Sequence, residues 1–362
     1  MMPRRYKEGP MNTSGIPVPG RRRAALSRGT ALAIAGIIAG SAIITGPALE
    51  PARAVMDLAS GTFTSAQSLR ILGRDGRFTI LLLGSDARAG GLVGRTDAIL
   101  VASVDPVSGR AAVFSIPRDT VNFPLSARSK YAGKINALYP YLVRKHGVRR
   151  AGTVMRAIVG SAMGIEIDAY ALIGFTGFRK LVNNIGGVDV YLTRTIRDPK
   201  YTILVNGVRR LITFRQGWNH LEDLRALAYA RIRYVDNDYA RSRRQQQVIV
   251  AAIQKVLTRG PERLAGLVAA SAGLIKTDLP LVDAPLVYAM VSRANLATAP
   301  RVVFGPRTYA TALPYSRIVL RLTICKAWIR RYFPPVHPGA AWLPPEPTPA
   351  PTPEPTPTPA VP

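Results

Sequence analysis

Arginine is concentrated in residues 231–244, where five arginines stand against only two acids, Asp236 and Asp238. Positive charges at this density repel one another unless anions neutralise them. The planar guanidinium group binds two phosphate oxygens at once. The first arginines would end one helix and the later ones would precede or open the next, whose amino terminus favours anions. A polyphosphate site is therefore predicted, and a solvated or RNA-binding basic stretch is the alternative. The residues placed around this site are Arg231, Arg233, Arg241, Arg244 and Gln245.

Two aspartates, Asp86 in GSDAR (84–88) and Asp97 in GRTD (94–97), stand at the end of one expected strand and just before the next. Loops at strand ends are where α/β sheets bind ligands. Mg²⁺ prefers such carboxylate oxygens and completes its shell with water and substrate phosphates. We expect Asp86 and Asp97 to hold Mg²⁺, with Arg88 and Arg95 as phosphate clamps. Alternatively, Asp86 caps a turn and Asp97 pairs with an arginine at the surface.

Arg118 belongs to SIPRDT (115–120), at the end of the second strand of an expected hairpin. This position would bring Arg118 beside the loop that carries Asp86. Lys134 and Asn136 follow in a loop that leads into an expected helix, and they are equally compatible with ordinary solvated loop residues.

Apolar runs bounded by turns supply the elements that must position these side chains. Continuous runs indicate buried strands, and apolar residues spaced by three or four indicate helices. Strands that alternate with helices predict the α/β class, as a layered α/β/α sheet of mixed strands with flanking helices, in one domain over residues 77–333. Expected strands cover 78–83, 98–104, 111–116, 168–174 and 188–192, and expected helices cover 152–163, 176–186, 221–230 and 244–257, with further candidates at 301–304 and 318–324.

The amino-terminal region predicts a membrane anchor. Residues 1–29 form a basic tail, residues 30–49 carry no charge and are long enough to cross a bilayer as one helix, and residues 50–76 form a linker. The positive-inside rule places the tail in the cytoplasm and the rest outside the cell. A cleaved secretory signal is the alternative, because Ala52-Arg53-Ala54 offers a cleavage site. Both interpretations export the domain.

Composition narrows the chemistry further. Lys and Arg number 49 and Asp and Glu 21, a net charge of +28 that suits nucleic acid, anionic lipid or phosphorylated ligands. Cys325 is the only cysteine and only three histidines occur, so an intrachain disulfide is excluded, a Cys/His zinc site is disfavoured and a metal site must use carboxylates. Residues 334–362 are rich in proline and predict an extended, unpacked tail.

Six separated motifs follow one another along residues 77–257. They are GSDAR, RTDAILVASVDP, SIPRDT, GKINALY, GFRKLVNNIGGVDV and ALAYARIRYVDNDYARSRRQQ. None of them is specific alone, but the ordered set resembles the LytR-CpsA-Psr family of cell-wall glycopolymer ligases. That family has a short cytoplasmic tail, one transmembrane helix and an external catalytic domain, which agrees with the expectation from residues 1–76.

The resemblance implies a phosphotransferase that moves a glycopolymer from a polyprenyl-pyrophosphate carrier to a peptidoglycan hydroxyl, at the membrane and without nucleic acid. Asp86 and Asp97 match the family's Mg²⁺-site positions. Asp238 matches an acid of the arginine-rich motif, where it would orient arginines, and Arg118 and Asp238 would then be the catalytic residues. The positions that match the family's pyrophosphate site are Arg118, Arg231, Arg233, Arg241 and Gln245.

Two segments depart from the family pattern. The family often has His-Asp and a longer segment after its paired arginines, where this chain has Tyr234-Val235-Asp236-Asn237, so the geometry of that loop stays open. The family's Thr/Ser-Glu-Arg-Gln becomes Ser242-Arg243-Arg244-Gln245, which adds charge and keeps the matched residues.

The charges suggest a mechanism in which Mg²⁺ and arginines neutralise the pyrophosphate and the departing polyprenyl phosphate. Asp119 is a candidate base only because it adjoins Arg118. The polyprenyl tail needs an apolar groove, but the composition alone favours ordinary core. A nucleic-acid-binding regulator is a second hypothesis, which the expected span disfavours, and a polyprenyl pyrophosphate hydrolase with water as acceptor is a third.

Overall fold

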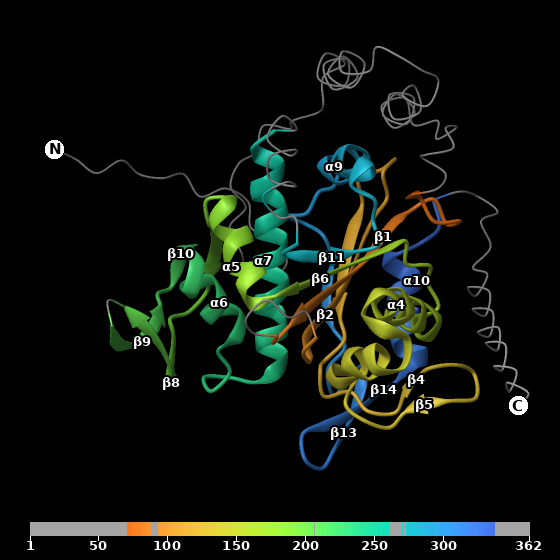
Figure 1. Cartoon of the computed structure of the whole chain (residues 1–362), viewed down its shortest axis with the longest axis horizontal. Helices are drawn as coiled ribbons and strands as arrows, with labels where there is room; N and C mark the ends of the chain where they lie inside the picture. The colour runs from red at the N-terminus through yellow and green to blue at the C-terminus, as the bar shows by residue number, and fades with distance from the viewer. Residues whose placement is uncertain (1–70, 88–92, 206, 261–269, 271–272, 337–362) are drawn as a thin grey trace, which may run out of the picture.

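A mixed sheet of six strands forms the centre of the domain (Figure 1). The structure, a computed structural model, describes residues 71–87, 93–205, 207–260, 270 and 273–336. Two neighbouring strand pairs, β1–β6 and β3–β12, are parallel, and the other three are antiparallel. The expected α/β class with a mixed sheet is confirmed, as is the β2–β3 hairpin. In spatial order the strands are β11 (Ile275–Thr277), β6 (Ala169–Gly174), β1 (Phe78–Ser85), β2 (Thr96–Val104), β3 (Ala111–Ser115) and β12 (Arg301–Val303).

Helices cover both faces of this sheet. Successive side chains of a strand point to opposite faces, and Leu81 and Leu83 pack in the core formed with α4 (Leu138–Met163) and α10 (Leu322–Tyr332). Leu82, on the other face, lies across a cavity from α7 (Asp238–Thr258). Helices α5 (Phe175–Asn184) and α6 (Asp223–Arg231) lie beside α7. The structure also describes α9 (Ala284–Ser292) and the short 3-10 helices η2 (Ile135–Ala137) and η4 (Leu281–Asp283).

The largest core lies between the sheet and the α4–α10 pair. Phe114 of β3 stacks on Phe304 with ring centroids 5.0 Å apart, and Trp328 of α10 meets Phe114 edge-on at 6.5 Å. Cys325, the only cysteine, is buried in the same cluster. Apolar burial of this kind contributes about 1.5–3 kcal/mol for each large side chain, so this core holds the sheet and both helices as one unit.

Helix α4 is longer than the helix expected over 152–163. Its backbone is interrupted at Gly147, whose φ of 77° and ψ of 160° lie outside the helical region, so two helical stretches follow one another. Glycine adopts positive φ without steric cost. The first helical stretch was not predicted, because the residues around this break are polar and basic and interrupt the apolar periodicity.

Four two-stranded sheets complete the described residues. Two of them, β7–β10 and β8–β9, extend the α5–α7 side and enclose a second core with these helices. Their strands are β7 (Val188–Leu192), β10 (Gly217–Leu221), β8 (Ile196–Val205) and β9 (Val208–Phe214), and the other pairs are β4 (Phe123–Pro124) with β5 (Lys130–Tyr131) and β13 (Ala310–Leu313) with β14 (Arg317–Leu320).

Residues on either side of the domain pack against it. Ile71 and Leu72 are buried, although they fall in the segment expected to be a linker. The backbone N–H of Val336 donates to the Asp75 carbonyl at 2.7 Å. The expected basic tail and the membrane span at 30–49 lie outside the described residues, as does most of the proline-rich tail. Among the helices that the structure describes, none has the length and apolar character to cross a bilayer.

Candidate active site

A β-bulge sets the position of Asp97. The pairing of β1 with β2 shifts by one residue beside Gly84 and Ser85, so Asp97 is an extra residue on β2 without a partner across the pair. A bulge redirects the side chain of its extra residue, and bulges are frequent beside active sites. The Asp97 carboxylate lines a cavity and accepts a hydrogen bond of 3.3 Å from the side-chain amide of Asn136.

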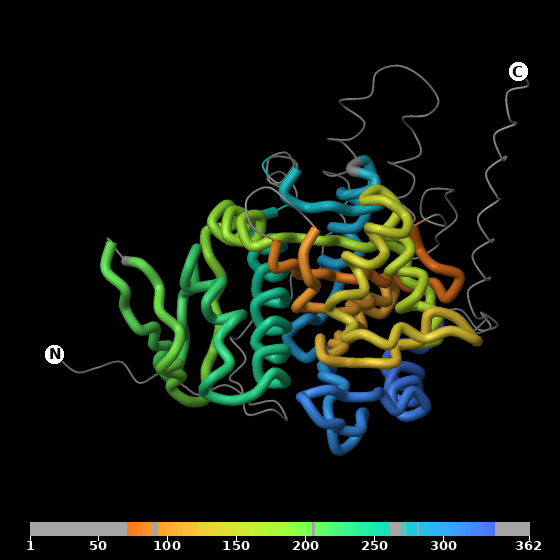
Figure 2. The backbone as a smooth tube through the Cα atoms, turned by 60° about the horizontal axis from the view of Figure 1, so that its bottom comes forward, coloured from red at the N-terminus to blue at the C-terminus, as the bar shows by residue number. Residues whose placement is uncertain are grey.

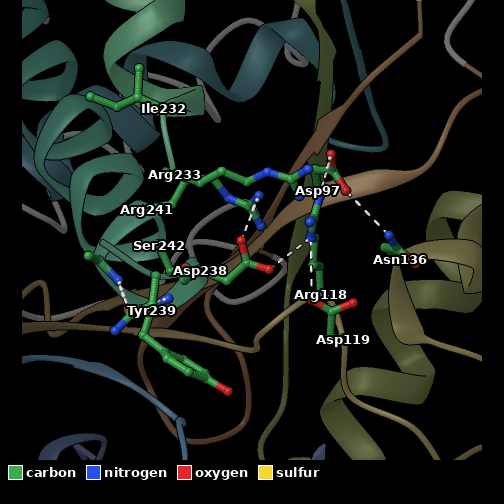
Figure 3. Close-up of polar contacts among 12 residues, drawn as sticks. Asp97, Arg118, Asp119, Asn136, Ile232, Arg233, Asp238, Tyr239, Arg241 and Ser242 are labelled. Atoms are coloured by element: carbon green, nitrogen blue, oxygen red, sulfur yellow. Dashed lines mark hydrogen bonds and ion pairs between the residues drawn. The ribbon is translucent and has the colours of Figure 1, made fainter. Parts of the chain in front are cut away.

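Arg118 is the centre of a network of three carboxylates (Figure 3). Its Nη1 lies 3.2 Å from Asp97, and its Nε lies 3.3 Å from Asp238 and 3.5 Å from Asp119. Burial would lower the pKa of Arg118, but these carboxylates, led by Asp97, outweigh it and raise that pKa. Arg118 is therefore a permanent cation, and side chains from three separate segments fix its orientation.

The arginine-rich segment forms the first turns of α7. This helix begins at Asp238, not at 244 as expected, because Asn237 caps it by accepting hydrogen bonds from the backbone N–H groups of Tyr239 (3.1 Å) and Ala240 (2.9 Å). The Asp238 carboxylate forms an ion pair with Arg241, one turn along the helix, at 3.1 Å. The cap already occupies these two N–H groups, so the side chains of the segment provide the positive charge that can contact a ligand directly.

Arg241 has an unfilled hydrogen-bonding capacity. Its side chain is only 5% exposed, and its Nε is buried with no hydrogen-bond partner among the described residues. Burial, and then the nearby Arg118, lower the pKa of Arg241. A buried donor without a partner costs about 1–3 kcal/mol, and an anionic ligand in the adjoining cavity would supply the missing acceptor.

Two further arginines line the same cavity without a carboxylate partner for their side chains in the described part of the chain. The Arg231 guanidinium lies 4.4 Å from the centroid of the Phe175 ring and donates a hydrogen bond of 3.3 Å to the Tyr201 hydroxyl. Arg233 is held through its backbone N–H, which donates to the buried Asp198 carboxylate at 3.1 Å. Their positive charge is thus held in place and left for a ligand.

Arg244 has a structural role. Its guanidinium is buried and contacts Asp236 through two nitrogens, at 2.6 and 3.1 Å, and it donates to the backbone carbonyls of Tyr229 and Ile232. Arg244 is not among the residues that line the cavity. The sequence placed Arg244 with the phosphate-binding arginines, and the structure instead shows it joining α7 to the end of α6.

Replacement of Arg244 by alanine is therefore expected to lower the free energy of unfolding by about 3–5 kcal/mol, because the buried Asp236 would lose its closest partner and keep only Arg194, at 3.8 Å. Chemical denaturation followed by circular dichroism measures this loss. The matched control is Arg243→Ala, since Arg243 is exposed on the same helix, and it should change stability by no more than about 0.5 kcal/mol. Equal stability of the two variants would contradict the structural role of Arg244.

The glutamines after these arginines divide in the same way. Gln245 lines the cavity and donates to the Ala230 carbonyl at 3.3 Å. Gln246 is buried and donates to the Ser115 hydroxyl and the Val302 carbonyl, both at 2.8 Å, so it ties α7 to β3 and β12. Gln245 thus lies where the sequence predicts it, and the role of Gln246 was not predicted.

Asp86 and Arg95, also predicted for the site, are not among the residues that line the cavity. Asp86 follows β1, and one of its carboxylate oxygens accepts the backbone N–H of Arg95 at 2.7 Å. The Arg95 side chain is exposed and does not line the cavity, and Arg88 lies outside the described residues. Within the described residues, the structure thus brings together Asp97, Arg118, Arg231, Arg233, Asp238, Arg241 and Gln245.

Asp119 and Asp238 are neighbouring carboxylates with opposite environments. The Asp119 carboxylate accepts a hydrogen bond of 2.6 Å from the Lys134 ammonium. Burial opposes ionisation of Asp119, but hydrogen bonds from Asp238 and Lys134 and the charge of Arg118 lower its pKa. Burial and the Asp119 carboxylate raise the pKa of Asp238. Asp119 is therefore the more acidic member of the pair, and its lowered pKa makes it a weak base.

An apolar cavity of about 530 Å³ opens between the sheet and helices α5 to α7. The four arginines Arg118, Arg231, Arg233 and Arg241 line it together with a wall of aliphatic and aromatic side chains. The expectation of ordinary core in this region is wrong, because these side chains line a cavity. The apolar lining includes Leu82, Leu100, Ile173, Phe178, Leu181, Val248, Ile249, Ala252 and Ile253.

The donor set fits a magnesium ion that is shared with a substrate. Among the described residues, no three carboxylate, histidine or cysteine side chains gather closely enough to enclose a metal by themselves. Mg²⁺ in phosphate sites needs only one or two protein carboxylates, with water and phosphate oxygens as the remaining ligands. Asp97, in the cavity beside the arginines, and Asp86, at the end of the neighbouring strand, offer such oxygens.

Asp198 and Tyr201 belong to the site but were not predicted. Asp198 is buried and accepts hydrogen bonds from the backbone N–H groups of Arg233 and Tyr234, both at 3.1 Å, which fixes the loop between α6 and α7. Both residues lie on β8, in a mixed polar stretch without a regular period. An isolated aspartate there gave no indication in the sequence that it would be buried.

Comparison with known proteins agrees with this geometry. A family model described as the LytR_cpsA_psr family matches residues 55–300. The chain is 32% identical over 182 residues to the polyisoprenyl-teichoic acid–peptidoglycan teichoic acid transferase TagV of Bacillus subtilis (strain 168), covering 49% of this chain and 44% of TagV. It is 30% identical over 212 residues to TagU of Enterococcus faecalis (strain ATCC 700802 / V583), covering 57% of this chain and 63% of TagU.

The match spans less than two thirds of the length of either relative. The crystal structure of B. subtilis TagV superimposes with a TM-score of 0.56 at 24% identity, over 71% of this chain and 97% of that chain, so the two share a fold. Because the family model covers more than half of the sequence, and the fold and the order of the motifs agree with it, the chain belongs to the LytR-CpsA-Psr family.

Proposed function

We propose that this protein is a phosphotransferase that moves a glycopolymer from a polyprenyl-pyrophosphate carrier to a hydroxyl of peptidoglycan. The observation that carries this proposal is an apolar cavity lined by four arginines, which outnumber its two aspartates, Asp97 and Asp198. A polyprenyl pyrophosphate has the same two parts, a hydrocarbon chain and a dianionic group. The printed names of TagV and TagU, which describe transfer from a polyisoprenyl-linked teichoic acid to peptidoglycan, support the same reaction.

Arginine side chains would provide most of the catalysis. The pyrophosphate would be neutralised by the four cavity arginines, Arg118, Arg231, Arg233 and Arg241. The unpartnered Nε of Arg241 would donate a hydrogen bond to a pyrophosphate oxygen. Gln245 would add an amide donor. Asp238 contacts both Arg118 and Arg241, at 3.3 and 3.1 Å, and would hold the two guanidinium groups in place.

Asp97 and Asp86 would hold Mg²⁺ beside these arginines, and the bound ion would add positive charge where the phosphate groups are transferred. Asp119 is a poor candidate for the base, because its pKa is lowered and its carboxylate is engaged by Lys134 and Arg118. The proposal therefore gives Asp119 a positioning role toward Arg118.

The expected location follows from residues 1–49. The basic tail and the uncharged run at 30–49 support a single-pass protein of the cell membrane, with its amino terminus in the cytoplasm and this domain outside. This location gives the domain access to a membrane-borne carrier and to the cell wall.

The full chain in detergent, incubated with a synthetic polyprenyl-pyrophosphate saccharide and peptidoglycan fragments, tests the function. Mass analysis of the products with Mg²⁺ or with EDTA should show a phosphodiester adduct only when Mg²⁺ is present. Release of free sugar phosphate without an adduct would favour the hydrolase. The absence of any carrier turnover would overturn the proposal.

The nucleic-acid-binding alternative loses support from the structure. Arg231, Arg233 and Arg241 line a cavity that is mostly apolar, and Arg244 is buried against Asp236. Of the five arginines in 231–244, only Arg243 is left on an open surface without such a role. A duplex cannot enter a cavity of this kind, because its phosphates are spread along an extended polar backbone.

Filling the cavity should weaken binding of the hydrocarbon chain. Ala252 lines the cavity from α7, and Ala252→Trp would displace several methylene groups of a bound chain. At about 0.8 kcal/mol for each methylene, a loss of about 2 kcal/mol corresponds to an increase in KM of about 30-fold. Turnover of a carrier with a much shorter lipid chain should change little. Thr258→Trp, exposed at the end of the same helix, is the control, and equal KM values for both variants would contradict a lipid role for the cavity.

A further inference from the structure

The β8–β9 hairpin carries exposed aliphatic side chains. It lies at the margin of the molecule, beyond α6 and α7, in both orientations (Figure 1, Figure 2). Ile212 and Phe214 anchor its base in the core shared with α6. Toward the other end, Leu204 and Val208 are each 56% exposed and Leu211 is 43% exposed. In the strand register Leu204 and Leu211 share one face of the hairpin and Val208 lies on the other, so both faces expose aliphatic surface to water.

Basic side chains share this hairpin with the aliphatic ones. Leu204 lies opposite Arg209 in the strand pairing, so an aliphatic and a basic side chain stand together on one face. The only acid of the hairpin, Asp198, is buried and engaged by backbone N–H groups. The exposed basic residues of the hairpin are Arg197, Lys200, Arg209 and Arg210.

This combination fits the surface of an anionic lipid bilayer. Aliphatic side chains enter the boundary between headgroups and acyl chains, while arginine and lysine extend to the lipid phosphates. Each basic side chain close to such a surface strengthens binding about fivefold. A glycan strand or another protein without acidic groups would not compensate the charge of this hairpin.

We propose that the outer part of the β8–β9 hairpin docks into an anionic membrane surface. The same hairpin contributes Asp198 and Tyr201 to the cavity lining, so docking brings the apolar cavity beside the bilayer. This inference concerns contact with lipid and does not depend on the proposed transfer reaction. It assigns the hairpin a role as the contact point between the folded domain and the membrane.

A single fluorescent label tests this contact. Cys325 is the only cysteine and is fully buried, so a cysteine introduced as Val208→Cys is labelled selectively with an environment-sensitive fluorophore. The labelled full chain is reconstituted into vesicles of phosphatidylcholine with phosphatidylglycerol, with or without spin-labelled lipid. We expect the emission to increase and shift to the blue, and the spin-labelled lipid to quench it.

Val107→Cys is the matched control, because Val107 is 43% exposed in the turn between β2 and β3. Its label should keep the emission of a fluorophore in water. If the label at 208 behaves in the same way, the proposal is overturned. A response to peptidoglycan sacculi in place of vesicles would equally overturn it.

Removing two arginines tests the contact with anionic headgroups more directly than high salt, which screens every charge of the protein. Arg209→Gln with Arg210→Gln, in the Val208→Cys background, should lower the ratio of docked to free hairpin about 25-fold. Both side chains are exposed, so a thermal melt should match that of the parent. An unchanged lipid response in vesicles with phosphatidylglycerol would show that anionic headgroups are not recognised and would refute this part of the proposal.

Discussion

The Arg118→Ala variant is expected to lose about 10³-fold in kcat/KM for transfer. Arg118 lies in the cavity, and its guanidinium is held by Asp97, Asp119 and Asp238 at 3.2 to 3.5 Å before any ligand binds. A cation held in this way needs no reorganisation when charge moves onto the leaving phosphate, and such donors are worth about 10²–10³-fold or more. Steady-state kinetics with a synthetic carrier measures the loss.

A lysine at the same position separates charge from geometry. Arg118→Lys keeps the positive charge but cannot contact two groups with one planar fork, so it should recover only part of the lost activity. The alanine variant also leaves three carboxylates facing one another. Its melting temperature should therefore fall more at pH 8 than at pH 5, because Asp238, whose pKa is raised, carries less negative charge at pH 5. Full activity in Arg118→Ala would remove Arg118 from the site.

Asp97→Asn is expected to abolish the response to Mg²⁺ and to lower turnover by about 10²-fold or more. The bulge on β2 directs this carboxylate into the cavity beside Arg118, and an amide oxygen is a much weaker ligand for a hard cation than a carboxylate. A titration of activity against Mg²⁺ concentration measures the effect.

The control for this variant is Glu166→Gln, which removes a surface carboxylate paired with Arg74 at 3.4 Å. It should leave the Mg²⁺ titration unchanged. If Asp97→Asn lowers turnover but keeps the wild-type Mg²⁺ dependence, Asp97 acts only through Arg118. If it changes neither, the assignment of Asp97 as a metal ligand fails.

Much of the sheet could be predicted because helices cover both faces of its central strands, so apolar residues follow one another along each strand. The segments 78–83, 98–104 and 111–116 are continuous apolar runs, and the structure confirms each as a strand. The hairpin formed by the last two correctly placed Arg118 at the same sheet edge as Asp97, since adjacent antiparallel strands bring the start of one beside the end of the other.

The cavity could not be predicted, since it depends on how helices and sheet pack. Val248 and Ala252 on α7 have the same spacing whether they fill a core or line a void. The start of α7 was missed because its first turns, DYARSRRQQQ, are mostly polar, and the Asn237 cap, not apolar periodicity, sets where the helix begins. Asp198 was missed because its partners are backbone groups distant in the sequence.

The pairing of β12 with β3 also has a consequence for how the chain folds. Arg301–Val303 aligns with Val113–Ser115 across most of the domain's length, and Gln246 bridges the two strands. Contacts between such distant segments form late, since a long loop must close first. During synthesis, the edge of β3 therefore stays open until the residues around 301 have emerged, so the domain completes its sheet only after nearly all of it is available.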